Sequence, residues 1–430
     1  MKKFALIAMA SSKNWYSYAP LFASLDDYNL FDKYDPFLLK KRTKTYIQKI
    51  TQKYDHCVFA FSFYTHEAPS IIKEVRMIKE SHPPDQITFI AGGPHPSGNP
   101  FQTLQLGFDI VVKGEGEWIF PRLLECLFKN EDLGSLKGIC YLNRNRFCES
   151  PPPDLLPLDQ YKTYSQRFQL YPPIEITRGC PFACKYCEVT YLFGQIMRHR
   201  SIETILDIVK HYQQIFTGRR TTDIRFISPN SLAYGSNDGR SPNPEKIITL
   251  IRSIHELGKD NLRIFFSSFP SETRPEFIST SLLEQIAPFI SNEQIAFGAQ
   301  SGSDRVLKLI GRAHTVQDVR NATYAVIDAH FIPLIDFILG LPVERPADQY
   351  LTLDLIKELI QLKCKIRIHY FMPLAGTPYE NANSVAIEPT ILSELGRYAQ
   401  EGSIEGNLDT QIRNSNRIQK FLRAFNTKIN

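Results

Sequence analysis

Three cysteines close together in one loop have the clearest chemical meaning of any residues in this chain. They are Cys180, Cys184 and Cys187, and their spacing is C-x3-C-x2-C. A loop this short can direct three thiolates at one centre, where they would hold three irons of a [4Fe–4S] cluster and leave the fourth iron open. A structural zinc site needs four closed ligands, and the nearest further donors, Glu188 and His199, lack a usual zinc-finger spacing.

The surroundings of the cysteines favour a working metal centre over three inert core thiols. Arg178, Gly179 and Lys185 make the segment polar and loop-like rather than apolar. An aromatic residue, Tyr186, stands directly before the last cysteine. The segment is therefore expected to lie at a site rather than inside a core.

This motif resembles the signature of the radical SAM superfamily, in which an aromatic residue precedes the third cysteine. In that family the open iron binds S-adenosylmethionine (SAM), and one electron from the cluster cleaves it to a 5′-deoxyadenosyl radical. The resemblance implies that Tyr186 packs against the adenine. Four later segments match the usual order of the catalytic half: 197–201, 295–303, 337–342 and 371–377.

The resemblance is closest to the radical SAM class with an N-terminal cobalamin-binding domain. Residues 1–135 alternate short apolar runs with helical stretches, which predicts βαβ units and a doubly wound, Rossmann-like parallel sheet. Ligands of such sheets bind outside the carboxyl ends of the strands, where two glycine-rich junctions stand. We expect the cobalamin contacts to come from these junctions: Gly92, Gly93, His95, Gly114, Glu115 and Gly116.

One departure from the family concerns the lower ligand of cobalt. Many cobalamin domains carry D-x-H-x-x-G after the first strand, and its histidine ligates the metal, but residues 11–15 contain no histidine here. His95 begins an H-x-x-G segment that follows a later strand and lacks the aspartate. We therefore expect either cobalamin without a protein histidine ligand, with His95 a loop residue near the cofactor, or no cobalamin.

Residues 136–165 are expected to connect the two halves. A β-hairpin around 143–145 would place Cys140 and Cys148 symmetrically about its turn, as reduced thiols rather than a regulatory disulfide. The proline-rich segment 151–157 that follows indicates a stiff linker.

Residues 166–380 contain six strand–helix units, which suit the partial (β/α)6 barrel of the radical SAM family. Side chains at the strand ends of such barrels face the active site. The resemblance places five of them near SAM: Ser228, Ser267, Ser268, Gln300 and Ser301. Gln300 stands where relatives often carry glutamate. Arg198 and Arg200 follow the cysteine loop and could pair with a carboxylate or lie at the surface. Residues 381–430 are expected to be mostly helical, ending in a basic amphipathic helix docked on its own protein.

Composition is compatible with two or three domains. The chain has 430 residues, 43% of them hydrophobic and 22% charged, and its net charge of +5 gives no case for broad nucleic-acid binding. No apolar run reaches the roughly 18 residues of a membrane span, and the short apolar N-terminus is interpreted as a buried strand rather than a signal peptide. Eight cysteines, three of them needed as free thiolates, predict a reducing cytoplasm.

These observations predict a cytoplasmic, cobalamin-dependent radical SAM enzyme that methylates an unactivated carbon of a small molecule. Ring formation or rearrangement are alternative outcomes, and a flavodoxin or ferredoxin would supply the electron. A second hypothesis is a radical SAM enzyme without cobalamin. Methylthiotransferases belong here, but the cysteines outside the loop fit the second triad they need poorly: Cys57, Cys126, Cys140 and Cys148. A third hypothesis, a non-catalytic metal-binding protein, leaves the order of the barrel motifs unexplained.

Methyl transfer would require the strand ends of both domains to face each other. We therefore expect Gly93, Gly114, Cys187 and Gln300 to border one shared cleft, with Tyr186 on its wall.

Overall fold

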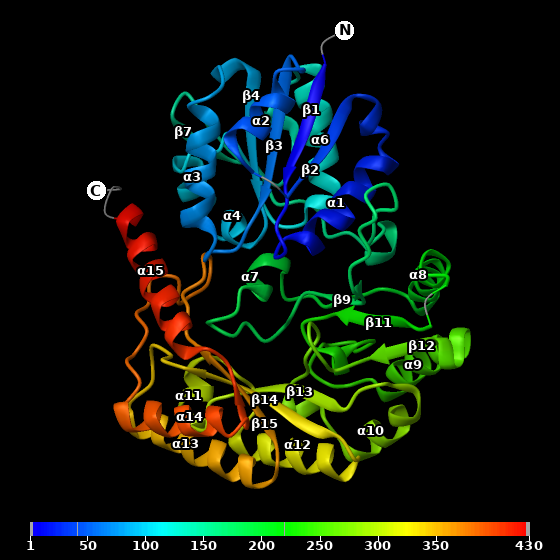
Figure 1. Ribbon diagram of the computed structural model, residues 1–430, viewed down its shortest axis with the longest axis vertical. Helices are drawn as coiled ribbons and strands as arrows, with labels where there is room; N and C mark the ends of the chain where they lie inside the picture. The colour runs from blue at the N-terminus through cyan, green and yellow to red at the C-terminus, as the bar shows by residue number, and fades with distance from the viewer. Residues whose placement is uncertain (1–2, 41, 219, 427–430) are drawn as a thin grey trace.

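The computed structural model describes residues 3–40, 42–218 and 220–426. Two α/β units lie one above the other, the N-terminal unit in blue to cyan and the second in green to orange (Figure 1). A short helix, α7 (Val189–Phe193), lies between them, and the last helix, α15 (Leu408–Asn426), extends from the second unit toward the first.

The N-terminal sheet confirms the expected doubly wound architecture. Its strand order is β2-β1-β3-β4-β5-β6-β7, and the first five strands run parallel. These five strands are β1 (Phe4–Met9), β2 (Tyr34–Leu39), β3 (His56–Ser62), β4 (Ile87–Gly92) and β5 (Ile110–Val112). The order 2-1-3-4-5 places a topological switch point between β1 and β3, where ligands of such sheets bind.

Helices cover both faces of this sheet, as the nearly continuous apolar strands require. One face packs against α2 (Lys44–Thr51) and α3 (Ala68–Lys79), and the other against α1 (Trp15–Asp27) and α6 (Gly116–Lys129). The sequence pattern missed α1 and β2. The reason is local, because Pro20 interrupts the helical pattern of α1 and Pro36 lies within the edge strand β2, where proline is tolerated.

The hairpin assigned to the connector belongs to the N-terminal sheet instead. Its strands, β6 (Ile139–Asn143) and β7 (Arg146–Glu149), add antiparallel to β5 around a turn with two positive φ angles, 48° at Arg144 and 63° at Asn145. Cys140 lies opposite Glu149, whereas Cys148 lies opposite Tyr141. The two thiols therefore point to opposite faces of the hairpin, and both are free.

The second unit is an open barrel of six strands in two sheets. One sheet contains β12 (Leu262–Phe265), β11 (Thr222–Ile227) and β8 (Ile174–Glu175), and the other begins with β13 (Gln294–Gln300), β14 (Ile332–Leu339) and β15 (Lys365–Tyr370). The sheets meet where the Ala296 amide donates to the Ser267 carbonyl over 2.8 Å. The outer helices are α8 (Ile202–Ile215), α9 (Pro244–Gly258), α10 (Thr280–Ile286), α12 (Val316–Asp328) and α13 (Pro346–Gln361).

The C-terminal region completes the barrel sheet and also reaches the N-terminal domain. After α14 (Pro389–Gln400), the strand β16 (Ile404–Glu405) pairs parallel with β15. Helix α15 is anchored by the Ser415 hydroxyl, which donates to the Phe371 carbonyl over 2.7 Å. Its Phe421 ring lies 6.2 Å from the ring of His95, so the helix docks on its own protein as expected. Among the described helices, none combines the length and apolar character needed to cross a bilayer.

Candidate active site between the two domains

The cysteine loop follows the first barrel strand at its carboxyl end, where barrel active sites are built. The strand β9 (Thr177–Arg178) leads into the loop, and its partner β10 (Arg198–His199) lies beyond α7. Backbone bonds fix the loop without any metal: Lys185 N–H donates to the Ile310 carbonyl over 2.9 Å, and Cys180 N–H to the Gly194 carbonyl over 3.1 Å. The positions of the thiols are therefore set by the fold.

The three thiols are shielded from water to different extents. Cys184 is buried, while Cys180 and Cys187 are partly buried. Burial raises the pKa of both partly buried thiols, that of Cys187 to about 12, so metal binding would have to displace protons. Within the described residues no three Cys, His, Asp or Glu side chains converge as the ligands of a single ion would.

Several charged side chains that the sequence pattern did not reveal lie around Cys184. The Arg274 guanidinium lies 3.8 Å from the Cys184 sulfur and donates to Glu276 over 2.6 Å. Arg312 donates to the Gly298 carbonyl over 2.7 Å, at the carboxyl end of β13. Although burial opposes it, His314 and Arg274 lower the pKa of Glu276 to about 2. One buried nitrogen on each arginine has no partner within the described chain, which fits a ligand that carries a carboxylate.

The five serine and glutamine side chains expected near SAM lie at barrel strand ends, but their hydroxyls differ in availability. Ser228 accepts from the Asn230 amide over 3.2 Å, and the Ser267 hydroxyl lies 2.8 Å from that of Ser231. The Ser268 hydroxyl is buried and has no partner among the described residues. Gln300 lies at the bulge that ends β13, and the Ser301 hydroxyl lies 3.3 Å from that of Thr352 in α13. Of the serines, Ser268 is thus the freest to bind a ligand and Ser301 is tied to the outer helix layer. Their roles stay predictions.

A cavity of ≈ 350 Å³ separates the N-terminal sheet from the cysteine segment. Its upper wall is formed by the carboxyl ends of β3, β4 and β5, and its lower wall includes α7. The expected cobalamin residues that line it are Gly92, Gly93, Gly114, Glu115 and Gly116. Cys187, Tyr186 and Gln300 are not among the lining residues, so the predicted common cleft does not include them. Beside the cysteine loop the cavity is lined by Arg178, before the first cysteine, and by Glu188 and Val189, after the third.

His95 lies in the core of the N-terminal domain rather than in a loop beside the cavity. It is fully buried in α4 (Pro94–Gly98), its ring stacks on Phe63 at 5.4 Å, and its Nδ1 lies 3.3 Å from the Thr65 hydroxyl. Burial lowers the pKa of His95 to about 3, so the ring is neutral. The expectation of a loop residue near the cofactor is therefore corrected, because the chain enters a helix directly after Gly93.

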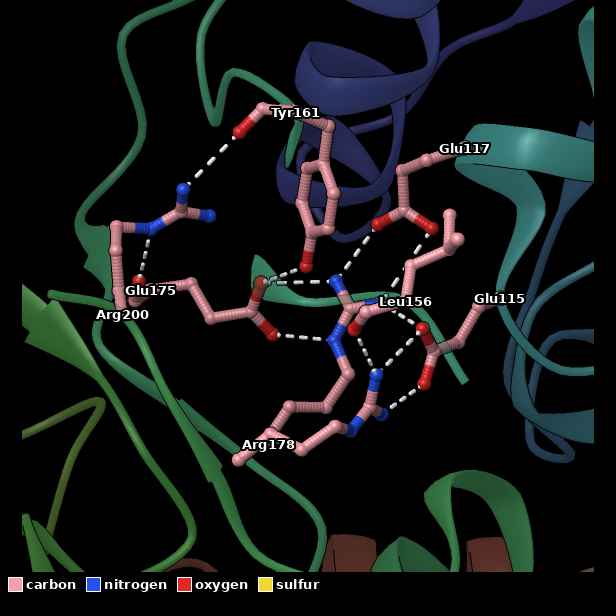
Figure 2. A network of polar contacts seen from close by, with 8 residues as sticks. Glu115, Glu117, Leu156, Tyr161, Glu175, Arg178 and Arg200 are labelled. Carbon is pink, nitrogen blue, oxygen red and sulfur yellow. Dashed lines mark hydrogen bonds and ion pairs between the residues drawn. The ribbon is translucent and has the colours of Figure 1, made fainter. Parts of the chain in front are cut away.

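The domains are joined beside the cavity by a buried ion network centred on Arg178 (Figure 2). Arg178 contacts Glu115 at 3.1 Å and Glu117 at 2.6 Å, both at the start of α6 in the N-terminal domain. It also contacts Glu175 of the barrel at 2.8 Å, which in turn accepts from the Tyr161 hydroxyl over 3.0 Å. Arg178 precedes the cysteine loop, so this network connects that loop to the glycine-rich junction of the other domain.

Two further arginines complete the network, and neither is a surface group. Arg198 pairs with Glu115 and donates to the Leu156 carbonyl over 2.6 Å. Arg200 donates to the carbonyls of Glu175 and Tyr161, each over 3.0 Å. Burial alone would lower the pKa of Arg178, but the charges of Glu117 and Glu175 outweigh it and raise that pKa. The Arg178 guanidinium therefore remains charged.

Two stretches of the chain match models of known protein families. Residues 174–356 match the model of the radical SAM superfamily, and residues 37–124 match that of the B12 binding domain. The uncharacterized methyltransferase PH0819 of Pyrococcus horikoshii is 26% identical over 77% of this chain and 69% of its own length. The putative methylthiotransferase MJ0865 of Methanocaldococcus jannaschii is also 26% identical, over 75% of this chain and 68% of its own length.

A solved structure shares the fold of nearly the whole chain. The radical S-adenosylmethionine methyltransferase TsrM from Kitasatospora setae, with cobalamin and a [4Fe–4S] cluster bound, superimposes with a TM-score of 0.67. The match covers 89% of this chain and 77% of TsrM at 14% sequence identity. The likeness therefore concerns the arrangement of the two domains.

Proposed function

We propose that this chain, a radical SAM domain joined to a B12-binding domain, is a cobalamin-dependent radical SAM enzyme that methylates an unactivated carbon of a small molecule. The observation that carries the proposal is the cavity between the domains. One wall is the glycine-rich carboxyl edge of the N-terminal sheet, and the other begins at Glu188, directly after the third cysteine. A substrate in this space would lie between the two cofactor positions.

The residues present fit the cofactors that this function requires. Cys180, Cys184 and Cys187 would hold the [4Fe–4S] cluster, and the unpartnered nitrogens of Arg274 and Arg312 would bind the carboxylate of SAM. Cobalamin would lie along the glycines of the upper wall: Gly92, Gly93, Gly114 and Gly116. When bound, the cluster with SAM supplies the means to break an unactivated C–H bond, and cobalamin supplies the methyl group.

The work of the protein is then to hold these groups in line and to exclude water. Apolar side chains of α7, including Leu192 and Phe193, line the lower wall opposite Ile90 and Val112 of the sheet. The Arg178 network holds the two walls at a fixed distance, because its carboxylates come from both domains. Fixed placement of the reacting groups removes much of the entropic part of the barrier.

A methylthiotransferase is the second candidate, since one relative carries that name. Such enzymes need another cysteine triad in the N-terminal domain. Here Cys57 and Cys140 are buried in its core, where burial raises the pKa of the two thiols to about 12 and about 11. Core thiols that stay protonated do not favour this candidate over cobalamin-dependent methylation.

Anaerobic reconstitution tests the proposal. Protein loaded with iron, sulfide and hydroxocobalamin should show both cluster and corrin absorption, and should form 5′-deoxyadenosine from SAM when a flavodoxin or another one-electron donor reduces it. Cluster bands without retained corrin would favour the second candidate. Protein that retains neither the cluster nor corrin would refute an enzymatic role.

Electron paramagnetic resonance of the Co(II) form tests the expected absence of a histidine ligand. We expect no three-line nitrogen splitting on the cobalt axis. A splitting that disappears in His95→Ala would contradict both that expectation and the buried position of His95.

A further inference from the structure

One carboxylate of the cavity differs from all the others that line it. The acidic lining residues are Glu115, Glu117, Glu175 and Glu188. The first three are ion-paired with Arg178. The Glu188 carboxylate has no hydrogen bond or ion pair with any described residue, and its Oε2 atom is buried.

The position of Glu188 places this unpaired carboxylate at the centre of the proposed chemistry. It directly follows Cys187 and precedes α7, yet its side chain does not cap that helix. Helix α7 lies between the two units (Figure 1), and Glu188 lines the same cavity as the carboxyl edge of the upper sheet. Tyr64, from the end of β3, lines the same cavity and lies within electrostatic reach of Glu188.

No structural role accounts for a carboxylate in this place. Its cavity neighbours in the chain, Val189, Leu192 and Phe193, are apolar, and no described arginine or lysine lies near enough to be its partner. An unpaired carboxylate in such surroundings destabilises a fold, whereas an apolar side chain of the same length would pack there at no such cost. Buried polar groups without protein partners indicate that a ligand completes them.

We propose that Glu188 binds a nitrogen donor of a ligand in this cavity. The donor is either a carboxamide N–H of the corrin ring or a protonated nitrogen of the substrate, close to the carbon that reacts. The proposal rests on the proposed function and deepens it, because it assigns a recognition group to the same cavity. If the substrate supplies the donor, the proposal assigns the substrate to the class of molecules that carry a basic nitrogen.

The test uses Glu188→Met, which keeps the length of the side chain and removes both oxygens, with Glu117→Met as the matched control from the paired set. Wild-type protein is first shown to hold cluster iron and corrin, so that a failure of the proposed function is seen separately. Glu188→Met should then keep or raise the melting temperature of the unliganded protein, whereas Glu117→Met should lower it. Glu188→Gln serves as a second variant that keeps one acceptor oxygen.

Two calorimetric titrations distinguish whether the corrin ring or the substrate supplies the nitrogen donor. If corrin supplies it, hydroxocobalamin should bind Glu188→Met about tenfold or more weakly than wild type, as expected for the loss of a hydrogen bond to a charged group. If the substrate supplies it, hydroxocobalamin should bind equally, and 2-phenylethylammonium should bind the corrin-loaded wild type but not the variant. The size-matched 3-phenylpropanoate should bind neither.

Two outcomes would overturn the proposal. One is a Glu188→Met protein that binds hydroxocobalamin and 2-phenylethylammonium as wild type does. The other is a melting temperature that falls as far as in Glu117→Met, since that would reveal a structural role.

Discussion

Cys180, Cys184 and Cys187 lie in a loop held by backbone hydrogen bonds to Gly194 and Ile310, and each offers its thiol to the site. Around them the decisive single residues are charged. Arg274 lies beside Cys184, and Arg178 lies two positions before Cys180. At this scale, burial raises the pKa of the Cys180 and Cys187 thiols, and the nearby positive charge of Arg274 offsets part of that effect at Cys180.

Replacing any one of the three loop cysteines with alanine should remove the cluster. Two thiolates cannot hold three irons, so iron content should fall from about four per chain to near zero and 5′-deoxyadenosine formation should stop. Iron counting and product chromatography measure this. Cys364→Ala is the control, because Cys364 is buried away from the loop beside β15 and its loss should leave the iron in place.

His95 should make the protein sensitive to mild acid. Its folded pKa of about 3 lies below the unfolded value near 6.5, so only the unfolded chain binds this proton between those values. Stability is unaffected above pH 6.5 and falls below it, by at most about 1.4 kcal/mol per pH unit for this group.

His95→Phe should therefore flatten the decline in urea midpoint between pH 6.5 and pH 4.5. Above pH 6.5 the variant and wild type should differ by a constant amount, which is the internal control. An unchanged acid slope would show that another histidine causes the decline.

At the scale of elements, the junctions between strands and helices shape the cavity. Gly93 ends the turn from β4 into α4 with φ +87°, and a Cβ there would lie 2.7 Å from the Ser62 hydroxyl. The hairpin β6–β7 closes the sheet edge beside β5, the strand that carries the second glycine-rich junction. The cavity wall is therefore made by tight turns rather than by long loops.

Gly93→Ala should weaken corrin binding while leaving the cluster intact. The added methyl group forces both the backbone and Ser62 to move at the cavity wall. Gly396→Ala is the opposite case, because Gly396 lies inside α14 with nothing within 4 Å of the added Cβ. It should raise stability by roughly 0.5–1 kcal/mol and leave hydroxocobalamin affinity unchanged in the same titration.

At the scale of the whole molecule, the two domains are held in one orientation by contacts on both sides of the cavity. The Arg178 network joins them on one side, and α15 joins them on the other through Phe421 and His95. The Asn99 side chain adds a link when it donates to Glu380 over 2.7 Å. These contacts keep the strand ends of the two domains facing each other.

Arg178→Met should loosen the two domains and lower the melting temperature strongly. It leaves the buried Glu117 carboxylate without its arginine partner and takes one partner from Glu115 and from Glu175, a loss of about 3–5 kcal/mol for a buried pair. Arg263→Met removes an exposed pair with Asp223 and should cost no more than about 1 kcal/mol. Faster proteolysis between the domains in Arg178→Met, and not in Arg263→Met, would confirm that the network joins them.

Much of this protein could be derived from the sequence, because the deciding signals are local. The short apolar N-terminus interpreted as a buried strand is β1, and the spacing of the three cysteines predicted a metal-binding loop. Alternating strands and helices predicted both the doubly wound sheet and the barrel. Each of these features depends on residues a few positions apart, whose relation is set by the geometry of the backbone.

What only the tertiary structure decided involves residues far apart in the chain. Arg178 and Glu117 are 61 positions apart and meet because the domains dock. In the docked arrangement the Glu188 carboxylate has no partner among the described residues. His95, in the helix after Gly93, is buried in the core. Pairing and burial of charged side chains depend on which surfaces come together. A short sequence pattern carries no information about that, because the free energy of a buried charge is set by whatever neighbour the rest of the fold brings to it.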